Sequence, residues 1–466
     1  MTNETLRVFT GHLWDGLSDT LLRDAAVAVR GDTVVFAGPR GALDIPETAR
    51  VTETGGVLLP GLIDLHVHAR PGYLGWFLAA GVTTIRDAAN SLDLVAALRG
   101  AQDPSPRVFA AGPLLDGPRA FFRQFGPGAV HEAGDGHERR AGAWTVRHPD
   151  EARAQVRRLA DLGVTHVKLY EQLDPQSFAA AAAEARRLGL PVMTDLGLAG
   201  TRGLSGAEVD ARQALAAGVR SIEHVSGYAL AYRRMGGDPL GRTLDPARLG
   251  ELAARTVAAG TALVPTLSVH EGLAEEDAPD LGQLPLGTLE GPVMAALRAQ
   301  WARTHPLGAG ARRVARADRR MAHEMLRRVA ALGGTVGAGT DTPASAFNLP
   351  GGGLHRELEL LVAAGLSPLQ ALKGATSAAA RILERPDLGV LRPGALADFV
   401  VVAGNPLEDV RRTRELRLVV RGGQALSPDA LRDTAAAHDV PAQLSSSGRV
   451  RAAGPGPAVP PGSGTP

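Results

Sequence analysis

The sequence of 466 residues contains no cysteine, and this absence limits the chemistry open to it. Disulfides, thiolate metal sites and cysteine nucleophiles are excluded, so any metal must be held by nitrogen and oxygen ligands. Lysine is nearly absent as well: of the 50 basic side chains only Lys168 and Lys373 are lysines. A position that keeps lysine in such an arginine-rich chain is expected to need a primary amine.

A charge excess and a long hydrophobic run are also missing. The 50 basic and 49 acidic side chains give a net charge of +1. Because no basic stripe is interleaved with aromatic residues, we expect no nucleic-acid partner. No segment approaches eighteen unbroken apolar residues, and residues 1–14 carry charges, so we expect no membrane association and a cytoplasmic protein. The apolar fraction of 44% is enough to fill a sizeable globular core.

Both ends of the chain contain short runs of β-forming residues. These runs are Arg7–Phe9, Ala26–Val29, Thr33–Phe36, Asp398–Val402 and Leu416–Val420. The second and third are separated by Gly31 and Asp32, which favour a hairpin turn. We predict a small β-sandwich built from residues 1–59 together with 386–435. Residues 441–466 are mostly Ser, Gly, Pro and Ala, and we predict a disordered tail there.

Between residues 60 and 385, short apolar runs alternate with Ala-, Leu- and Arg-rich helical stretches, which is typical of βα units around a parallel sheet. The eight runs are Leu62–His66, Val82–Arg86, Arg107–Ala111, Val164–Leu169, Pro191–Asp195, Arg220–His224, Thr261–Pro265 and Thr335–Asp341. We predict an α/β fold in which a (β/α)8 TIM-type barrel is inserted into the β-sandwich. Two long connections, 112–148 and 267–320, are expected to cover or shape a site.

The first of these strands ends in a His-x-His pair. His66 and His68 point the same way, because side chains repeat every two residues along a strand. Taken alone, the pair is as consistent with hydrogen-bonded core histidines as with metal ligands. Polar residues at the ends of three further strands, Lys168, His224 and Asp341, favour the metal. In a (β/α)8 barrel these ends meet at one face, where functional groups collect.

Several segments resemble the amidohydrolase superfamily, in its imidazolonepropionase-like and prolidase-like branch. They are Pro60–His68, Val82–Asp87, His166–Tyr170, Ser221–His224 and Gly339–Asp341, with supporting stretches at 357–365, 371–381 and 389–398. The resemblance covers roughly residues 5–425. It implies a metal-dependent hydrolase with a binuclear metal centre at the carboxyl end of the barrel.

The resemblance also implies the role of each ligand. His66 and His68 bind one ion, His224 binds a second, a carboxylated Lys168 bridges both, and Asp341 is a ligand that also carries the catalytic proton. Imidazole and carboxylate suit Zn²⁺, with Mn²⁺ or Fe²⁺ as alternatives. A lysine amine can form the bridging carbamate, whereas an arginine guanidinium stays protonated. The competing interpretations are a surface lysine, a core histidine and an aspartate that caps a helix.

The sequence departs from this family at the fifth strand. The family normally has a histidine there as a ligand of the second ion, but this strand ends in Asp195, and no histidine lies between His166 and His224. Three readings remain: Asp195 binds the second ion, the second ion is lost, or the site has become a non-catalytic scaffold. We favour the first, because carboxylate is an ordinary ligand of zinc and manganese.

Other polar residues near the strand ends are weaker candidates. Tyr170, Tyr228, Arg70 and His355 are predicted substrate contacts, since each lies just beyond a strand that carries a candidate ligand. Other residues on these strands are expected to support the site from below: Asp64 and His166 share the parity of His66 and Lys168, and Glu223 has the opposite parity to His224.

The predicted reaction is hydrolysis of a small amide, either dipeptide-like, an N-acyl amino acid or a cyclic amide, by attack of a metal-bound hydroxide. Hydrolysis of an ester, lactone or phosphotriester at the same site is the alternative within enzymes. A non-catalytic metal-binding scaffold is the alternative outside them. The predicted partner is a small-molecule substrate, and homo-oligomerisation is left open.

Overall fold

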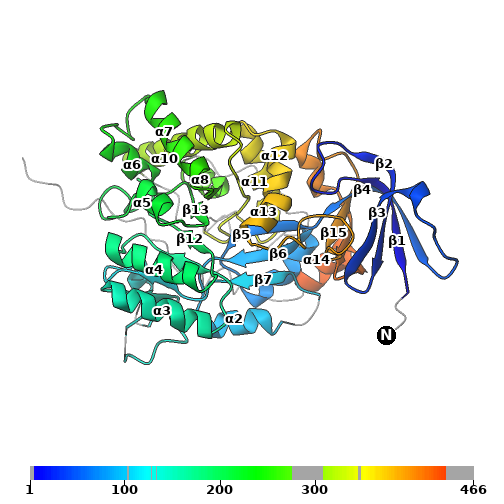
Figure 1. The fold of residues 1–466 in the computed structure, drawn as a ribbon, viewed down its shortest axis with the longest axis horizontal. Helices are drawn as coiled ribbons and strands as arrows, with labels where there is room; N and C mark the ends of the chain where they lie inside the picture. The colour runs from blue at the N-terminus through cyan, green and yellow to red at the C-terminus, as the bar shows by residue number, and fades with distance from the viewer. Residues whose placement is uncertain are drawn as a thin grey trace, which may run out of the picture.

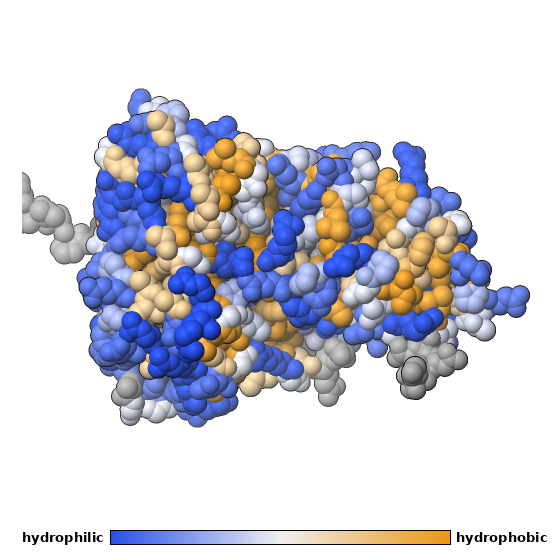
Figure 2. Space-filling view, in the orientation of Figure 1, coloured by the Kyte–Doolittle hydropathy of each residue, from blue (hydrophilic) through white to orange (hydrophobic). Residues whose placement is uncertain are grey.

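The computed structural model describes residues 5–101, 104–126, 128–132, 134–274, 308–344 and 348–436. It consists of a β-sheet at one end and a larger α/β region, in which helices surround the strands (Figure 1). The predicted tail, 441–466, lies outside the described residues. Among the helices that are described, none is long and apolar enough to cross a membrane. On the face shown in Figure 2, polar side chains dominate the α/β region, and apolar ones are more frequent over the sheet.

The smaller part is one hydrogen-bonded sheet that joins both ends of the chain. Its strands are β1 (Arg7–Leu13), β2 (Leu22–Arg30), β3 (Thr33–Pro39), β4 (Arg50–Pro60), β15 (Phe399–Val402), β16 (Leu416–Arg421) and β17 (Gln424–Leu426). Their order is β17-β16-β15-β4-β1-β2-β3, and all neighbours are antiparallel except β1 and β4. In its core Phe9 and Phe399, from opposite ends of the chain, pack edge to face with ring centroids 5.1 Å apart. The predicted β-rich element made from both chain ends is confirmed.

The larger part contains parallel strands that match the predicted ones closely. They are β5 (Leu62–Val67), β6 (Val82–Asp87), β7 (Arg107–Ala110), β11 (Val167–Leu169), β12 (Val192–Thr194), β13 (Ser221–Glu223) and β14 (Ala262–Val264). The first three form one sheet, and β11 to β14 belong to a second, seven-stranded sheet. The two sheets approach each other where the amide of Thr165 donates to the carbonyl of Ala110 at 3.0 Å.

The eighth predicted strand, Thr335–Asp341, is an irregular segment rather than a continuous strand. It forms isolated parallel bridges with both of its expected neighbours, Val336 with β14 and Thr342 with β5. Glycine is required here because the segment approaches β5 closely: a Cβ added at Gly339 would lie 2.9 Å from the Cβ of His66. The segment therefore occupies the place of the eighth strand.

Helices lie around these strands. They are α1 (Leu74–Ala79), α2 (Leu92–Arg99), α3 (Pro149–Asp161), α4 (Pro175–Arg187), α5 (Ala211–Ala216), α6 (Tyr228–Arg234), α7 (Pro246–Ala258), α8 (Leu267–Ala274), α10 (Ala309–Ala331), α11 (Gly352–Ala363), α12 (Pro368–Gly374), α13 (Ser377–Ile382) and α14 (Pro428–Ala436). Helix α3 shows why they pack: it buries Ala152, Val156 and Leu159, which share one face at helical spacing. Short 3-10 helices are η1 (Arg40–Ala42), η2 (Pro71–Tyr73), η3 (Phe121–Phe125) and η4 (Val410–Arg414).

The long connection 112–148 is more ordered than a plain loop. It contains η3 and the short strands β8 (Leu114–Asp116), β9 (Val130–His131) and β10 (Ala143–Thr145). These strands extend the larger sheet in the order β11-β8-β10-β9. The connection is therefore built directly onto β11, the strand that carries Lys168. Of the second long connection, 267–320, residues 275–307 lie outside the described part of the chain.

The long strand β4 was not predicted from the sequence. β4 leads from the smaller sheet straight into β5, with only Gly61 between them. A Cβ at Gly61 would lie 2.2 Å from the hydroxyl of Thr83, so the chain can pass here only with glycine. The amide of Gly61 also donates to the carbonyl of Asp398 at 3.0 Å. The base of β5 is thus fixed by contacts with both ends of the chain.

Candidate metal centre

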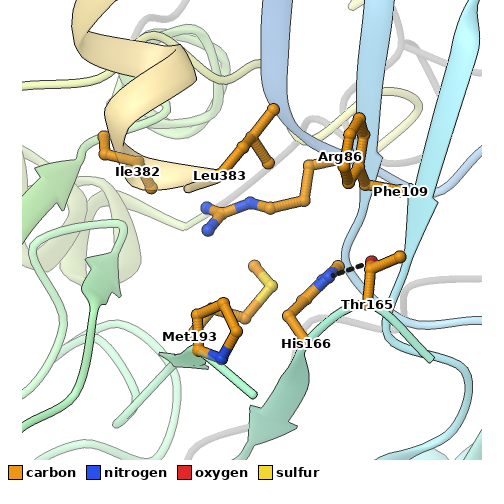
Figure 3. A pocket seen from close by; sticks show the side chains of 8 residues that line it. Arg86, Phe109, Thr165, His166, Met193, Ile382 and Leu383 are labelled. Carbon is orange, nitrogen blue, oxygen red and sulfur yellow. Dashed lines mark hydrogen bonds between the residues drawn. The ribbon is translucent and has the colours of Figure 1, made fainter. Parts of the chain in front are cut away.

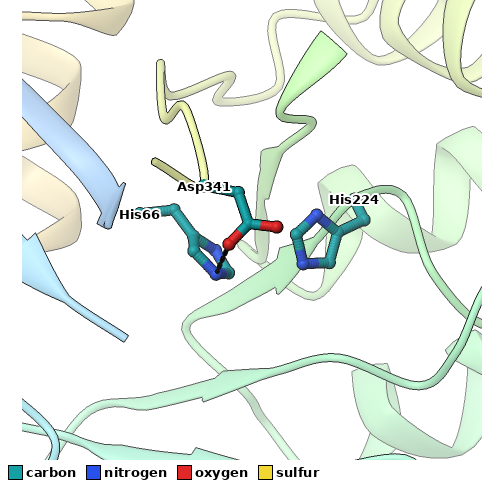
Figure 4. A group of neighbouring side chains, drawn as sticks. All are labelled: His66, His224 and Asp341. Carbon is teal, nitrogen blue, oxygen red and sulfur yellow. Dashed lines mark ion pairs between the residues drawn. The ribbon is translucent and has the colours of Figure 1, made fainter. Parts of the chain in front are cut away.

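Four segments bring four of the predicted ligands to one face of the strands. His66 lies on β5, Lys168 lies on β11, His224 directly follows β13, and Asp341 lies in the irregular eighth segment. His66, His224 and Asp341 are buried, and each offers one ligand atom within 4.8 Å of those of the other two. Figure 4 shows the carboxylate of Asp341 between the two imidazole rings.

The three imidazoles are held from outside through their Nδ1 atoms. The partners are the Oε2 of Glu223 at 2.7 Å for His66, the carbonyl of Ala89 at 3.0 Å for His68, and the hydroxyl of Thr266 at 2.6 Å for His224. A carbonyl only accepts, so the Nδ1 of His68 carries a hydrogen, and its Nε2 is left to face the site. Such outer bonds are what fix the tautomer and orientation of metal-binding histidines.

The inner nitrogen of each ring faces a carboxylate. The Nε2 atoms of His68 and His66 lie 3.1 and 3.5 Å from Oδ1 of Asp341. The Nε2 of His224 lies 3.6 Å from Oδ2 of Asp195. Burial lowers the pKa of His66 well below its usual value, so this ring is neutral and able to act as a ligand. Imidazole nitrogens and carboxylate oxygens thus converge on a common space.

Two of these side chains reach the site through unusual backbone conformations. His224 and Asp341 both have φ of +59°, in the left-handed region that residues other than glycine seldom adopt. β13 has ended at Glu223, so strand parity no longer holds at the next residue. Glu223 points inward to His66, and His224 turns into the same site beside it. Strained residues of this kind concentrate at functional sites.

Glu223 is the centre of a buried support beneath His66. Its carboxylate accepts hydrogen bonds from NH2 of Arg86 at 3.0 and 3.1 Å and from the hydroxyl of Ser221 at 2.5 Å. Arg86 in turn donates through Nε to the carbonyl of Leu65 at 2.5 Å. Every polar group in this chain of contacts is buried, so the position of the His66 ring is over-determined. The predicted supporting role of Glu223 agrees with this geometry.

Asp64 supports the site from the same strand. Its carboxylate accepts bonds from the hydroxyl of Thr340 at 2.7 Å and from the amides of Thr340 and His66 at 3.0 and 3.2 Å. Burial raises the pKa of Asp64 to about 7. These bonds tie β5 to the residue that precedes Asp341.

Lys168 is 1% exposed, although lysine side chains in folded proteins are normally exposed to solvent. Within the described residues its Nζ makes no hydrogen bond and no ion pair. Burial lowers the pKa of Lys168, while the carboxylates of Glu223 and Asp195 oppose this effect. Lys373 behaves in the ordinary way and pairs with Asp19 at 2.7 Å near the surface. The competing interpretation of a surface lysine therefore does not hold for Lys168, whereas Lys373 lies near the surface.

Asp195 uses its two oxygens differently. Oδ1 accepts a hydrogen bond from the amide of Gly197 at 2.9 Å, which caps the turn after β12. Oδ2 faces the Nε2 of His224 at 3.6 Å. The capping role and a ligand role are therefore compatible in one side chain.

The four predicted substrate contacts divide into two groups. Tyr170 lies at the site, with the Nζ of Lys168 5.9 Å from its ring centroid. Arg70 follows His68 at the start of η2 and is half-buried, with no hydrogen-bond partner for its buried Nε among the described residues. Tyr228 and His355 are not brought to the site.

The predictions for Tyr228 and His355 are corrected by their long-range contacts. Tyr228 is fully buried in α6, where its hydroxyl bonds that of Thr256 at 2.6 Å. His355 is buried in α11, with Nδ1 on the hydroxyl of Thr413 at 2.9 Å and Nε2 on the carbonyl of Ala80 at 3.0 Å. Both side chains have their polar atoms satisfied inside the fold, so neither is available to a substrate.

His166 directly precedes β11 and lines a small pocket near the amino ends of β11 and β12 (Figure 3). The pocket is lined by Arg86, Phe109, Thr165, His166, Pro191, Met193, Ile382 and Leu383. The ring Nδ1 is 2.9 Å from the hydroxyl of Thr165, and burial lowers the pKa of His166 well below its usual value. This pocket is separate from the ligand cluster.

The sequence reading assigned no role to Arg86 or Thr266. Arg86 had a usable signal, since it is a charged residue in an otherwise apolar strand and such a residue needs a buried partner. Nothing in the sequence around Thr266 indicates that it contacts His224. This contact depends on the turn after β14, where Thr266 has φ of +48°.

A model of the amidohydrolase family matches residues 57–426, and the chain therefore belongs to this family. Among solved structures, a putative prolidase from Bifidobacterium longum has a TM-score of 0.65 and 25% sequence identity, with 93% of this chain and 99% of that chain covered. The ochratoxinase of Aspergillus niger has a TM-score of 0.68 and 20% identity, over 91% of this chain and 96% of that chain.

At the sequence level, this chain is 37% identical to the A. niger ochratoxinase over 98 residues. That match spans 20% of this chain and 19% of the curated relative. The family and the barrel-type α/β fold predicted from the sequence are confirmed by the family match and the structural likeness.

Proposed function

We propose that this chain is a metal-dependent hydrolase that cleaves a small amide, such as a dipeptide-like substrate, an N-acyl amino acid or a cyclic amide. The observation that supports it best is the common orientation of three imidazoles. Each has its Nδ1 on an outer partner and its Nε2 directed at a carboxylate. Histidines that only fill a core would not be expected to direct their Nε2 atoms toward one common space.

The donor set suits two divalent ions. His66 and His68 would hold one ion and His224 with Asp195 the other, while Asp341 would be a further ligand. A carboxylated Lys168 would bridge them. The feature that favours this role is a buried lysine side chain whose Nζ has no hydrogen bond among the described residues. Nitrogen and oxygen donors without sulfur are compatible with Zn²⁺, our first choice, and with Mn²⁺ or Fe²⁺.

Bound divalent ions would polarise the substrate carbonyl and lower the pKa of the attacking water. Asp341 would take a proton on its carboxylate from that water and deliver it to the nitrogen of the departing amine. Its place between His66 and His224 supports this role, because a water held among these side chains would lie beside its carboxylate. Burial, reinforced by the charge of Asp195, raises the pKa of Tyr170 well above its usual value, so its hydroxyl would stay protonated and donate to the substrate.

Esters, lactones and phosphotriesters remain the alternative substrates, because the same water could attack any of them. The family match and the likeness to a putative prolidase favour the amide. A scaffold without turnover is disfavoured by the buried support of Glu223 and Arg86, which serves no purpose unless the His66 ring must be held in one position.

The test is a metal-reconstitution experiment with matched histidine variants. The purified chain is stripped of metal, supplied with Zn²⁺, Mn²⁺ or Fe²⁺ and bicarbonate, and assayed on N-acyl amino acids, dipeptides, lactones and triesters. We expect amide hydrolysis that depends on metal and is lost in His66→Asn. His12→Asn, the same change at an exposed position on β1, should keep full activity. Wild-type metal content in His66→Asn would contradict the assignment.

We also propose the division into residues 1–59 with 386–435 and residues 60–385, and a cytoplasmic location. Limited proteolysis followed by mass spectrometry would test the first, and fractionation of the source cells the second.

A further inference from the structure

Aromatic residues are scarce in this chain but gather at one place. They make up 4% of the sequence, yet three of the ten phenylalanines, Phe121, Phe122 and Phe125, lie within the five residues of η3. Their rings pack on one another with centroids 5.4 to 6.3 Å apart. We call these three residues and Tyr170 the aromatic cluster.

The aromatic cluster continues directly from the metal centre. Tyr170 directly follows β11 and lies two residues beyond Lys168, whose Nζ is 5.9 Å from the tyrosine ring. The ring of Tyr170 is in turn 6.3 Å from that of Phe121 and 6.4 Å from that of Phe122. A series of aromatic faces therefore leads outward from the candidate ligands.

The cluster is held in place by buried polar contacts. Asp116 accepts hydrogen bonds from the amide of Phe121 at 3.1 Å and from the amide of Gln172 at 2.8 Å, so it joins η3 to the segment after β11. Arg202, from the loop that follows Asp195, stacks on Phe121 at 5.3 Å and donates to the carboxylate of Glu171 at 2.6 Å. A preorganised surface of this kind binds a ligand without an ordering cost.

The fold does not need three phenylalanines here. Phe122 and Tyr170 cover a small apolar group of Ala89, Leu114, Ala120, Val130 and Ala143, but Phe121 and Phe125 do not belong to it. Phe121 and Phe122 stay half-buried, and Phe125 is 39% exposed. Apolar ring surface is thus left uncovered beside the site, where a ligand could bury it.

We propose that Phe121, Phe122 and Tyr170 form a specificity site for an aromatic group of the substrate, next to the amide that is cleaved. This inference rests on the proposed function and narrows it to amides with an aromatic side chain, of the N-acyl-phenylalanine type. Ring–ring contacts of edge-to-face geometry, as already present within the cluster, would hold the group.

The test compares N-acetyl-L-phenylalanine, N-acetyl-L-leucine and N-acetyl-L-alanine on metal-reconstituted protein. We expect the phenylalanine compound to have the highest kcat/KM. Phe121→Ala should lower the ratio of kcat/KM for the phenylalanine compound to kcat/KM for the alanine compound by about ten-fold, mainly by raising KM for the phenylalanine compound. A change of about ten-fold is the size expected from losing one buried ring contact. Hydrolysis of the alanine compound, which has no ring to contact Phe121, should fall much less. Phe36→Ala, which removes a half-buried ring from β3, is the matched control and should change neither.

A structural role of the cluster would give a different result. An equal loss for both compounds in Phe121→Ala, or an unchanged ratio, would overturn the specificity site, and so would equal rates for leucine and phenylalanine in wild type. Phe121→Leu keeps an apolar side chain without a ring, so it controls for misfolding of the loop in Phe121→Ala. It should restore only part of the preference for the phenylalanine compound.

A binding measurement without turnover tests the specificity site independently of the proposed hydrolysis. In an Asp341→Asn background, calorimetry should show the phenylalanine compound binding at least about ten-fold tighter than the alanine compound, and Phe121→Ala should remove the difference. If wild type hydrolyses neither compound but this difference persists, hydrolysis of N-acyl amino acids is excluded from the proposed function and the aromatic site stands. Equal binding of the two compounds would refute the aromatic site.

Discussion

Asp195 offers the sharpest test of the second metal site, because its two oxygens have separate tasks. Oδ1 accepts the hydrogen bond from Gly197, and Oδ2 faces His224. Asp195→Ala removes both functions. Asp195→Asn can keep the bond to Gly197 through its amide oxygen but loses the charge that a divalent ion needs. The pair of variants thus separates the cap from the ligand.

The expected magnitudes follow from these contacts. Loss of the bond to Gly197 should cost Asp195→Ala about 1 kcal/mol of unfolding free energy without metal, and Asp195→Asn much less. Changes in the partners of ligands alone weaken metal binding about 10 to 100-fold, so removal of a ligand should exceed about 100-fold for the second ion. Both variants should therefore retain one ion per chain and lose most of the activity.

The assay is metal content after dialysis, with chemical unfolding of the metal-free proteins beside it. Asp195→His restores the family's usual residue and should keep two ions, with the acid limb of the pH–rate profile moved downward because the site gains one positive charge. Two ions in Asp195→Ala would refute the ligand role. One ion in both wild type and Asp195→Ala would mean that the second site never formed.

Three further predictions follow from the buried groups. Lys168→Ala should lose metal and activity and recover part of both with added short carboxylic acids, and full activity in Lys168→Arg would contradict the carbamate, since guanidinium cannot form it. Glu223→Gln should weaken metal binding about 10 to 100-fold by loosening the His66 ring, as measured by competition with a chelator; unchanged affinity would remove Glu223 from the site. Burial lowers the pKa of His355 from 6.5 to about 4. The unfolded chain therefore binds this proton more tightly than the folded chain does. The stability contribution should be complete above pH 6.5 and fall toward pH 4 by up to about 3 kcal/mol, at about 1.4 kcal/mol per pKa unit. In urea unfolding the stability of wild type should fall toward pH 4 more than that of His355→Gln does, by this amount, and equal pH dependence in the two proteins would contradict it.

The parts of the site that obey strand periodicity were predictable from the sequence. His66 and Lys168 lie within regular strands, so parity and position placed them correctly. The scarcity of lysine drew attention to Lys168 before any geometry was known, and its burial agrees with the expected need for an amine there.

The parts that depend on departures from regular structure were not predictable in the same way. Glu223 and His224 are neighbours of opposite parity, yet both contact His66, because the chain turns into the left-handed region at His224. Tyr228 and His355 follow candidate strands just as Tyr170 does. Their partners, Thr256 and Thr413, lie 28 and 58 residues away, and no local pattern reveals such contacts.

The fold was predicted better than its irregular elements. Alternating apolar runs and helical stretches gave seven barrel strands to within a few residues. The long strand β4 was missed, because its first half is exposed and rich in Thr, Glu and Gly, so it lacks the apolar pattern of a buried strand. The eighth segment was predicted as a continuous strand but forms only isolated bridges. Its glycines permit a close approach to β5 without a continuous hydrogen-bond ladder.

The most direct test of the central claim is the metal content of the wild-type chain together with its amide hydrolysis, before and after chelation. Protein supplied with Zn²⁺ and bicarbonate should hold two ions per chain, lose hydrolysis of N-acyl amino acids when the metal is removed, and regain it when the metal is restored. A chain that holds no ion under these conditions, or one that hydrolyses the amide equally well without metal, would contradict the account.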